Sequence, residues 1–371
     1  MKHPSLSCLY SREETFMHAT ESATSPSGAA NQPELHRAII DCDIHHFTGT
    51  KAIKSYLPLA LADLLSAYGA NLPSGTPNGG PACSVKDLAT LQENHLNPNH
   101  VKYGILTGES YGMQGVGNSH YAAAICSAIN DHTKEQWLSQ DNRLKGSIFV
   151  TKQAPQLAVK EIDRLAGSGI WAQVIFSNGA HLPFGNSFYY PIYEACVRHN
   201  LPVMIHAGME GGGMNSPTTG AGYVTHLAEW KASQTQAMMA HLASLIFEGT
   251  FETFPELRIV LNEGGAFWLA PYLWRLDLDW KSLRVQTPWV KQLPSEYFRK
   301  HFRVTSPSLE KTPDEAIFHQ YMNSIHAHDT LMYCSNYPYH EVDAPLASLP
   351  SIDETLQERI LYRNAAELYK L

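Results

Sequence analysis

Short apolar runs alternate with longer amphipathic segments along most of this chain. The runs are largely aliphatic or β-branched and nearly continuous, which is typical of parallel strands buried on both faces. They predict eight strands, at residues 38–44, 101–106, 145–150, 170–176, 202–206, 258–261, 302–305 and 330–335. The segments between and after them predict helices at residues 121–131, 154–166, 188–200, 229–253, 313–325 and 356–371.

This alternation favours a fold of the α/β class, a (β/α)₈ TIM barrel. Eight strands and their helices over about 330 residues match the size of such a barrel with long loops. The competing architecture is an open, doubly wound sheet, which normally carries a Gly-rich turn after an early strand. The residues after Ile44 contain no such turn, so the barrel is preferred.

The first 36 residues differ from the rest in composition. They are rich in Ser, Ala, Thr and Glu and cannot bury much apolar surface. We therefore expect a flexible lead-in over residues 1–36 and one barrel domain over residues 37–371. A second loop-like stretch, residues 71–82, is dense in Gly and Pro.

The overall composition narrows the classes of partner. A hydrophobic content of 44% and a charged content of 17% are typical of a globular protein with a sizeable core. The net charge of −8 argues against binding to nucleic acid or to an anionic membrane surface. No apolar run reaches the roughly 20 residues that a transmembrane helix needs. The N-terminus has no continuous apolar segment typical of a signal peptide, so we expect a cytoplasmic protein that acts on a small molecule.

The six cysteines are scattered and include no CxxC pair. This spacing favours reduced intracellular thiols over a disulfide framework or a zinc finger. The nineteen histidines, in contrast, raise the question of which of them hold a metal.

Polar residues at the strand ends are the first candidates, because barrel enzymes carry their chemistry at the C-terminal ends of the strands. Asp43 and His45 end the first strand and share one of its faces. A carboxylate and an imidazole at this spacing form half of a first-row metal site, although a polar strand end that leads into a loop is the commoner explanation. His206 ends the fifth strand before small residues, and together with Asp43 and His45 it fits a ligand better than a structural histidine.

Two further strand ends carry candidate site residues whose roles the sequence does not decide. Glu263 follows the sixth strand and precedes two glycines, where it either lies at the barrel mouth or caps the next helix. Asn336 ends the eighth strand and can offer a carbonyl oxygen to a metal, but it cannot accept a proton near neutral pH. His340, Glu341 and Asp343 follow in a loop, where a surface role is the default.

Several long motifs carry a family resemblance. They are SLIFEGTFETFPELRIVLNEGGAFW at residues 244–268, LWRLD at 273–277, SNYP at 335–338 and ILYRNAAELY at 360–369. With these motifs the chain resembles the amidohydrolase-related family, in the branch that includes aminocarboxymuconate-semialdehyde decarboxylase and aromatic-acid decarboxylases. The resemblance runs from about residue 38 to the C-terminus.

The resemblance implies a metal-dependent barrel enzyme that forms homo-oligomers. It places the first-strand metal pair at Asp43 and His45 and the fifth-strand ligand at His206. Glu263 stands where many members have a catalytic histidine, as in one subgroup of the family. Asn336 stands where the family motif Ser-Asp-Tyr-Pro has its aspartate. Zinc is the expected ion, with manganese as the alternative.

The family contains hydrolases and non-oxidative decarboxylases, so either activity is expected, on a small aromatic or cyclic carboxylic acid. Our hypothesis is that Asp43, His45 and His206 bind the metal and that Asn336 contacts the metal or a bound water. Glu263 would then serve as the acid and base, because Asn336 cannot. The alternative is a catalytically impaired barrel that binds a small ligand. Substrate-binding residues are not predicted.

Overall fold

The computed structural model describes residues 38–68, 77, 84–109, 111–305, 307, 309–310, 312–339 and 352–371. The predicted lead-in, nearly all of the loop at residues 71–82, and the loop residues His340, Glu341 and Asp343 lie outside this part of the chain. Residues 38–371 form one compact unit, which contains every strand of the sheet.

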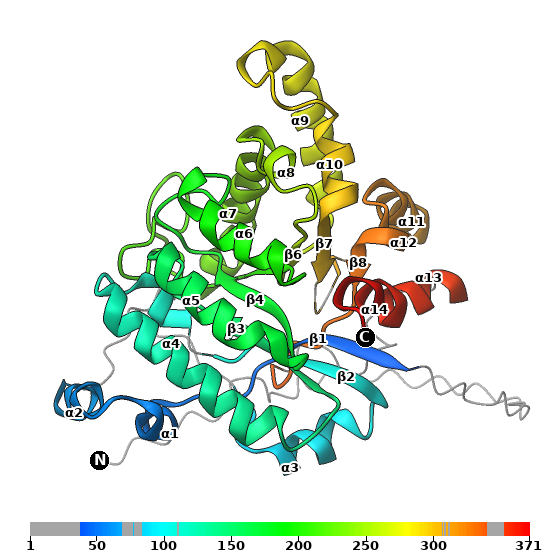
Figure 1. Cartoon of the computed structure of the whole chain (residues 1–371). Coiled ribbons are helices and arrows are strands. Elements are labelled where there is room, and N and C mark those ends of the chain that lie inside the picture. The colour runs from blue at the N-terminus through cyan, green and yellow to red at the C-terminus, as the bar shows by residue number, and fades with distance from the viewer. Residues whose placement is uncertain are drawn as a thin grey trace, which may run out of the picture. The chain divides into compact units, whose positions relative to one another are not determined.

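Eight parallel strands form the centre of this unit, and each pairs with the next along the chain, from β1 to β8 (Figure 1). The prediction of a (β/α)₈ barrel is therefore confirmed. The strands are β1 (Ile39–Ile44), β2 (Val101–Leu106), β3 (Leu144–Phe149), β4 (Trp171–Ser177), β5 (Val203–His206), β6 (Ile259–Asn262), β7 (Phe302–Thr305) and β8 (Leu331–Met332).

The barrel closes through backbone hydrogen bonds between β1 and the residues that follow β8. Cys42 N donates to Tyr333 O at 3.1 Å, and His45 N donates to Tyr337 O at 2.8 Å. The predicted strand at residues 330–335 was too long, because only Leu331 and Met332 pair regularly with β7. The rest of the segment crosses to β1 instead, and this crossing brings Asn336 to the barrel mouth.

Successive strand residues divide between two buried clusters, as expected when both faces of a parallel sheet are covered. Val203 and Ile205 of β5 pack in one cluster with residues of the surrounding helices, while Met204 between them belongs to the other. Val260 of β6 joins Met204 in this second cluster. These alternate apolar positions fill the barrel and leave the strand ends to polar residues.

Helices surround the strands (Figure 1). Those on the first half of the chain are α1 (Thr50–Ile53), η1 (Lys54–Tyr56), α2 (Leu59–Tyr68), α3 (Leu88–Leu91), η3 (Gln92–Leu96), η4 (Tyr111–Gly115), α4 (Ser119–Thr133), η5 (Lys134–Leu138), α5 (Pro155–Leu165), η6 (Ala166–Ser168), η7 (Ser187–Tyr189) and α6 (Tyr190–Arg198). Those on the second half are α7 (Leu227–Phe247), α8 (Thr250–Thr253), α9 (Leu269–Leu283), η8 (Arg284–Gln286), α10 (Pro294–His301), α11 (Glu315–Ser324), α12 (Ala327–Thr330), α13 (Glu354–Glu358), η9 (Arg359–Arg363) and α14 (Asn364–Tyr369).

The helix predictions were wrong in two respects. The predicted helix at residues 229–253 is interrupted, because Gly249 adopts a left-handed conformation (φ 75°) and separates α7 from α8. Among the α-helices, α1, α2, α3, α9, α10 and α12 were not predicted. The start of α10 carried a readable signal, since Pro294 opens the helix and the Glu296 carboxylate accepts a hydrogen bond from Leu293 N at 3.0 Å.

Two expectations from composition can be compared with the described residues. None of their helices is both long and apolar enough to cross a membrane. Cys42, Cys126, Cys196 and Cys334 are all buried and free, so these four cysteines form no disulfide.

Candidate metal centre

Four predicted site residues meet at the C-terminal ends of the strands. Asp43 and His45 come from the end of β1, His206 ends β5, and Glu263 follows β6. One potential ligand atom from each lies within 4.8 Å of the others. Asp43, His45 and His206 are buried and Glu263 is half-buried. The strand ends thus bring residues that are far apart in the sequence into one cluster.

A β-bulge shapes the first of these strand ends. The register between β1 and β2 shifts between Asp41 and Ile44. Bulges at barrel rims re-aim side chains that regular alternation would send elsewhere. Ile40 and Cys42 pack in the interior cluster. Asp43, directly after Cys42, faces the barrel mouth, where it accepts a hydrogen bond from Asn262 of β6.

Both histidines hold their second ring nitrogen ready for a ligand. Nδ1 of His45 lies 2.7 Å from Gly108 O, and Nδ1 of His206 lies 2.8 Å from Ala207 O. A carbonyl oxygen only accepts, so each Nδ1 carries a proton, and Nε2 is the nitrogen that can bind a metal once it has no proton of its own. This backbone contact is the usual way in which proteins orient metal-binding imidazoles.

Hydrogen bonds hold the Asp43 carboxylate from both sides. Thr107, just after β2, donates its hydroxyl to Oδ1, and Asn262 Nδ2 donates to Oδ2 at 2.7 Å. Thr305 of β7 donates in turn to the side-chain oxygen of Asn262, which fixes the orientation of that amide. His45 Nε2 lies 3.5 Å from Oδ1 and His206 Nε2 lies 3.4 Å from Oδ2, so the carboxylate stands between the two imidazoles.

Glu263 reaches the cluster from a left-handed backbone conformation (φ 64°), which is costly for a residue with a side chain. Its backbone N donates to Thr305 O at 3.1 Å, and its Oε2 lies 3.6 Å from His206 Nδ1. Glu263 does not cap the following helix, because α9 has no side-chain cap, and the Glu310 carboxylate accepts from Ala266 N and Phe267 N in the turn before it at 3.1 and 3.2 Å.

Asn336 lies at the same mouth, also in a left-handed conformation (φ 56°). Asparagine adopts this conformation more readily than most residues. The side chain is 5% exposed, and its Oδ1 is buried without a hydrogen-bond partner. The amide lies close enough to His45 to act on its pKa. Asn336 therefore lies beside the cluster and next to His45, and its side-chain oxygen makes no regular hydrogen bond.

The charges in the cluster are strongly linked. Burial opposes ionisation of Asp43, but the neighbouring His45 and His206 hold the pKa of its carboxyl well below the usual range. Burial also disfavours the charged form of His206, yet the negative charges of Asp43 and Glu263 raise its pKa to about 9. Burial lowers the pKa of His45. The buried carboxylates of the cluster are therefore stable only with compensating positive charge beside them.

A divalent cation would supply this positive charge. Nε2 of His45, Nε2 of His206 and Oδ1 of Asn336 are all buried and lack a hydrogen-bond partner. Buried polar atoms without partners are rare, and each normally reflects a missing water, ion or ligand. Two imidazole nitrogens, an amide oxygen and two carboxylates are donors that zinc and manganese both accept. The residues present are therefore suited to a metal ion.

Aromatic rings enclose the imidazoles. Tyr111 stacks on His206 with ring centroids 4.6 Å apart, and Tyr339 meets His45 edge-on at 5.1 Å. Neither tyrosine was predicted, and neither were Thr107 and Asn262. Thr107 and Asn262 stand at the ends of the second and sixth strands, so inspection of every strand end would have found them. Tyr111 begins η4 and Tyr339 lies in a loop, and no sequence signal marked either of them.

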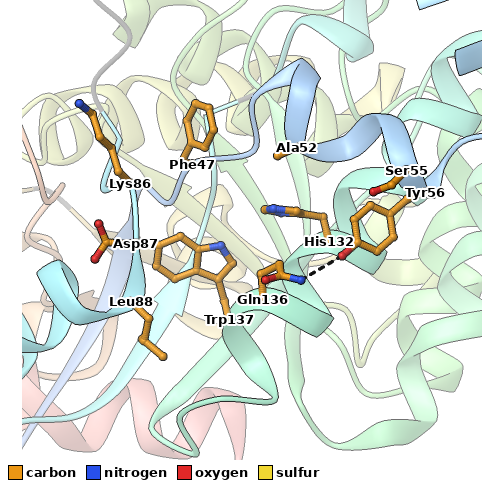
Figure 2. Close-up of a pocket in the computed structure, with 10 residues that line it drawn as sticks. All are labelled: Phe47, Ala52, Ser55, Tyr56, Lys86, Asp87, Leu88, His132, Gln136 and Trp137. Carbon is orange, nitrogen blue, oxygen red and sulfur yellow. Dashed lines mark hydrogen bonds between the residues drawn. The ribbon is translucent and has the colours of Figure 1, made fainter. Parts of the chain in front are cut away.

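A pocket of about 440 Å³ lies elsewhere on the unit, between the segment after β1 and the η5 region (Figure 2). Phe47, His132 and Trp137 turn towards it, and Gln136 at its edge donates to the Tyr56 hydroxyl at 3.2 Å. None of the four clustered residues lines it. We place the chemistry at the cluster and not in this pocket, because the cluster holds the buried, linked charges.

Comparison with known proteins gives a family match over nearly the whole chain. The family model described as Amidohydrolase matches residues 40–371. Among curated proteins, a gamma-resorcylate decarboxylase from Polaromonas sp. (strain JS666 / ATCC BAA-500) is 24% identical over 309 residues, which cover 77% of this chain and 88% of that protein.

Solved structures share the fold. One is a dihydroxybenzoic acid decarboxylase from Polaromonas sp. JS666 with bound manganese and 2-nitroresorcinol, with a TM-score of 0.66 and 18% identity over 90% of this chain and 97% of that one. Another is a 5-carboxyvanillate decarboxylase from Novosphingobium aromaticivorans, solved as an aspartate-to-asparagine mutant with bound manganese. Its TM-score is 0.67, with 20% identity over 90% of this chain and 97% of that one.

Proposed function

This chain belongs to the amidohydrolase family, as its motifs predicted, and on that premise we propose that it is a metal-dependent non-oxidative decarboxylase of hydroxylated aromatic carboxylic acids. The observation that carries the proposal is the convergence of Asp43, His45, His206 and Glu263 on one point with unpartnered ligand atoms around it. The relatives that act on resorcylate and other aromatic acids support the choice of decarboxylation over hydrolysis.

Asp43, His45 and His206 would hold the metal, with the amide oxygen of Asn336 as a further donor. When bound, a divalent ion supplies Lewis acidity and holds the carboxylate of the substrate and an adjacent oxygen. Manganese is our first choice, because the donors include several oxygens and three of the similar structures contain it. Zinc, the ion expected from sequence, is the alternative.

The amide at position 336 is compatible with metal binding. It offers an oxygen but no charge, so Asp43 and Glu263 supply the two carboxylates of the site. An aspartate-to-asparagine mutant of the Novosphingobium aromaticivorans enzyme was solved with manganese bound, so in that protein the loss of one aspartate leaves a metal site.

Glu263 is the residue placed to move a proton. It is the half-buried member of the cluster, and one of its carboxylate oxygens lies 3.6 Å from Nδ1 of His206. In its acid form it donates a proton to the ring carbon that bears the carboxylate. The bond from that carbon to the carboxyl carbon then breaks, its electron pair returns to the ring, and carbon dioxide leaves. Solvent reprotonates Glu263, so the net reaction consumes one proton.

We infer the direction from which the substrate approaches from the two tyrosine rings beside the imidazoles. Tyr111 and Tyr339 pack against the two imidazoles and exclude water from that side of the cluster. A planar substrate would approach from the side of Glu263, the half-buried member of the cluster. Cytoplasmic location and a homo-oligomeric state remain predictions from sequence.

The test combines metal analysis with one matched pair of variants. Purified protein loaded with Mn²⁺ or Zn²⁺ is assayed for carbon dioxide release from 2,6-dihydroxybenzoate and related phenolic acids, with lactones and amides as the hydrolysis panel. Glu263→Gln should retain stoichiometric metal and lose activity by about 100-fold or more. Glu248→Gln changes an exposed glutamate and should match the wild type.

Three outcomes would contradict the proposal. Stoichiometric metal with full activity in Glu263→Gln would remove Glu263 from the mechanism. Hydrolysis without decarboxylation would correct the reaction class. A wild-type protein that binds no divalent ion would favour a barrel that binds a ligand without catalysis.

A further inference from the structure

Asp41 is a buried carboxylate that the proposed chemistry does not use. It is fully buried on β1, two residues before Asp43. Its Oδ1 accepts from Ser335 N at 2.9 Å and from Asp43 N at 3.2 Å. Its Oδ2 lies 2.5 Å from Ser335 Oγ and 2.6 Å from His95 Nε2. A carboxylate has about four acceptor sites, so these partners fill all of them and leave none for a ligand.

His95 is a donor in this arrangement. The Asn99 amide donates to His95 O at 3.1 Å and lies 3.2 Å from His95 Nδ1. Because the carbonyl contact identifies the NH₂ group of Asn99, Nδ1 of His95 accepts a hydrogen bond and Nε2 carries the proton. Nε2 therefore donates to Asp41. The His95 ring also stacks on Tyr337, with centroids 4.5 Å apart and planes 14° apart.

These contacts hold both neighbours of Asn336. Ser335 is bonded to Asp41 through its backbone N and its hydroxyl. Tyr337 stacks on His95, donates its backbone N to Ser335 Oγ at 3.0 Å, and accepts from His45 N at 2.8 Å. Asn336 lies between these fixed residues, in the left-handed conformation that turns its amide towards the cluster.

We propose that Asp41 is a positioning residue, which holds Ser335 and His95 so that Asn336 faces the metal ligands Asp43 and His45. Its effect on turnover rests on the proposed function, whereas its effect on the position of Asn336 does not. In Asp41→Asn, one acceptor oxygen becomes an NH₂ donor and faces the hydroxyl of Ser335 and Nε2–H of His95. Two of the four contacts are then lost or reversed.

The decisive experiment is a crystal structure of metal-free Asp41→Asn beside metal-free wild type. Asn336 should leave its left-handed conformation and its side chain should move by an ångström or more. Mn²⁺ affinity, measured by competition titration, should fall about 10- to 100-fold, the range for residues that orient ligands. In the decarboxylation assay kcat should fall more than KM rises.

The matched control is Asn130→Ala. Asn130 is a buried residue that donates to Phe149 O at 2.9 Å and accepts from Phe149 N, and it lies outside the cluster. It should lower the melting temperature and leave the position of Asn336 and the Mn²⁺ affinity within about twofold of the wild type. Ser335→Ala removes the hydroxyl, which contacts Asp41 and accepts from Tyr337 N, and keeps the bond from the backbone N of this residue to Asp41. It serves in place of Asp41→Asn if that variant does not fold.

The proposal is overturned if Asn336 keeps its conformation and position in a folded Asp41→Asn or Ser335→Ala variant. This outcome is independent of the proposed function, which fails instead if the wild type binds no Mn²⁺ or releases no carbon dioxide from any of the acids. A displaced Asn336 in a wild type that proves inactive would therefore support the role of Asp41 and refute the decarboxylase.

Discussion

Asp43 and Asn262 are joined by a 2.7 Å hydrogen bond between strands β1 and β6, which are not neighbours in the barrel. The amide of Asn262 donates to one carboxylate oxygen while Thr107 donates to the other. The carboxylate cannot turn without breaking one of these bonds. Its orientation towards His45 and His206 is thus set before any metal arrives, which lowers the ordering cost of binding.

Replacement of this amide should weaken the metal site. Asn262→Leu keeps a similar volume but removes the donor to Asp43 and leaves the Thr305 hydroxyl without its acceptor. Mn²⁺ affinity should fall about 10- to 100-fold, because a ligand that is free to rotate binds less well. Competition titration measures the change. An affinity equal to that of the wild type would show that Asn262 does not orient the carboxylate.

Restoring the family aspartate tests the role of Asn336. Asn336→Asp adds a third carboxylate beside Asp43 and Glu263, so the metal-free protein should be less stable and the metal-bound protein more so. We expect Mn²⁺ affinity to rise at least about tenfold and the rise in melting temperature on metal addition to increase. If the wild type binds no metal and only the variant does, the natural chain is a ligand-binding barrel and not an enzyme.

Much of the barrel could be predicted from sequence, because strands buried on both faces leave near-continuous apolar runs that periodicity detects. The candidate site could be predicted to the extent that its residues stand at strand ends, as Asp43, His45 and His206 do. The role of Glu263 stayed open from sequence, since a carboxylate after a strand suits both a mouth and a helix cap. The structure excludes the role of helix cap, because α9 has no side-chain cap.

The sequence could not predict the contacts that depend on how the strands are aligned with one another in the barrel. The bulge after Asp41 and the crossing from β8 to β1 have no local signature, and they decide which of Asp41 and Asp43 faces the mouth. The same holds for Tyr111, whose stacking on His206 joins the start of η4 to the end of β5. Such pairings follow from the closed barrel and not from any pattern within a segment.

A buried histidine outside the cluster should make stability depend on pH. In neutral His241, Nε2–H donates to Asn178 O at 2.7 Å and Nδ1 accepts from Phe184 N at 3.2 Å. Burial of the ring disfavours its charged form and lowers the pKa of His241 from 6.5 to about 4. Between these values the unfolded chain binds a proton that the folded chain does not. The stability present above pH 6.5 is thus lost as pH falls towards 4, by about 3 kcal/mol for this residue.

Chemical denaturation of the wild type and of His241→Gln over this pH range measures the effect. Glutamine can donate to Asn178 and accept from Phe184 but does not titrate. The variant should be less stable at about pH 7.5 and should lose less unfolding free energy than the wild type on acidification. Parallel pH curves for the two proteins would show that His241 is protonated in the folded state as readily as in the unfolded one.

A close backbone approach supports the loop that follows His206. A Cβ atom at Gly179 would lie 2.1 Å from Met209 O and 2.5 Å from Glu210 N, and backbone atoms cannot give way as a flexible side chain can. Gly179→Ala must therefore displace this loop, at a cost of about 1–3 kcal/mol of unfolding free energy. Because the loop begins directly after His206, Mn²⁺ affinity should fall as well.

Gly167→Ala is the matched control, since a Cβ there meets nothing within 4 Å, and it should be neutral or slightly stabilising. Equal unfolding free energies for the two variants, measured by denaturant titration, would show that the loop has room to move and does not fix His206.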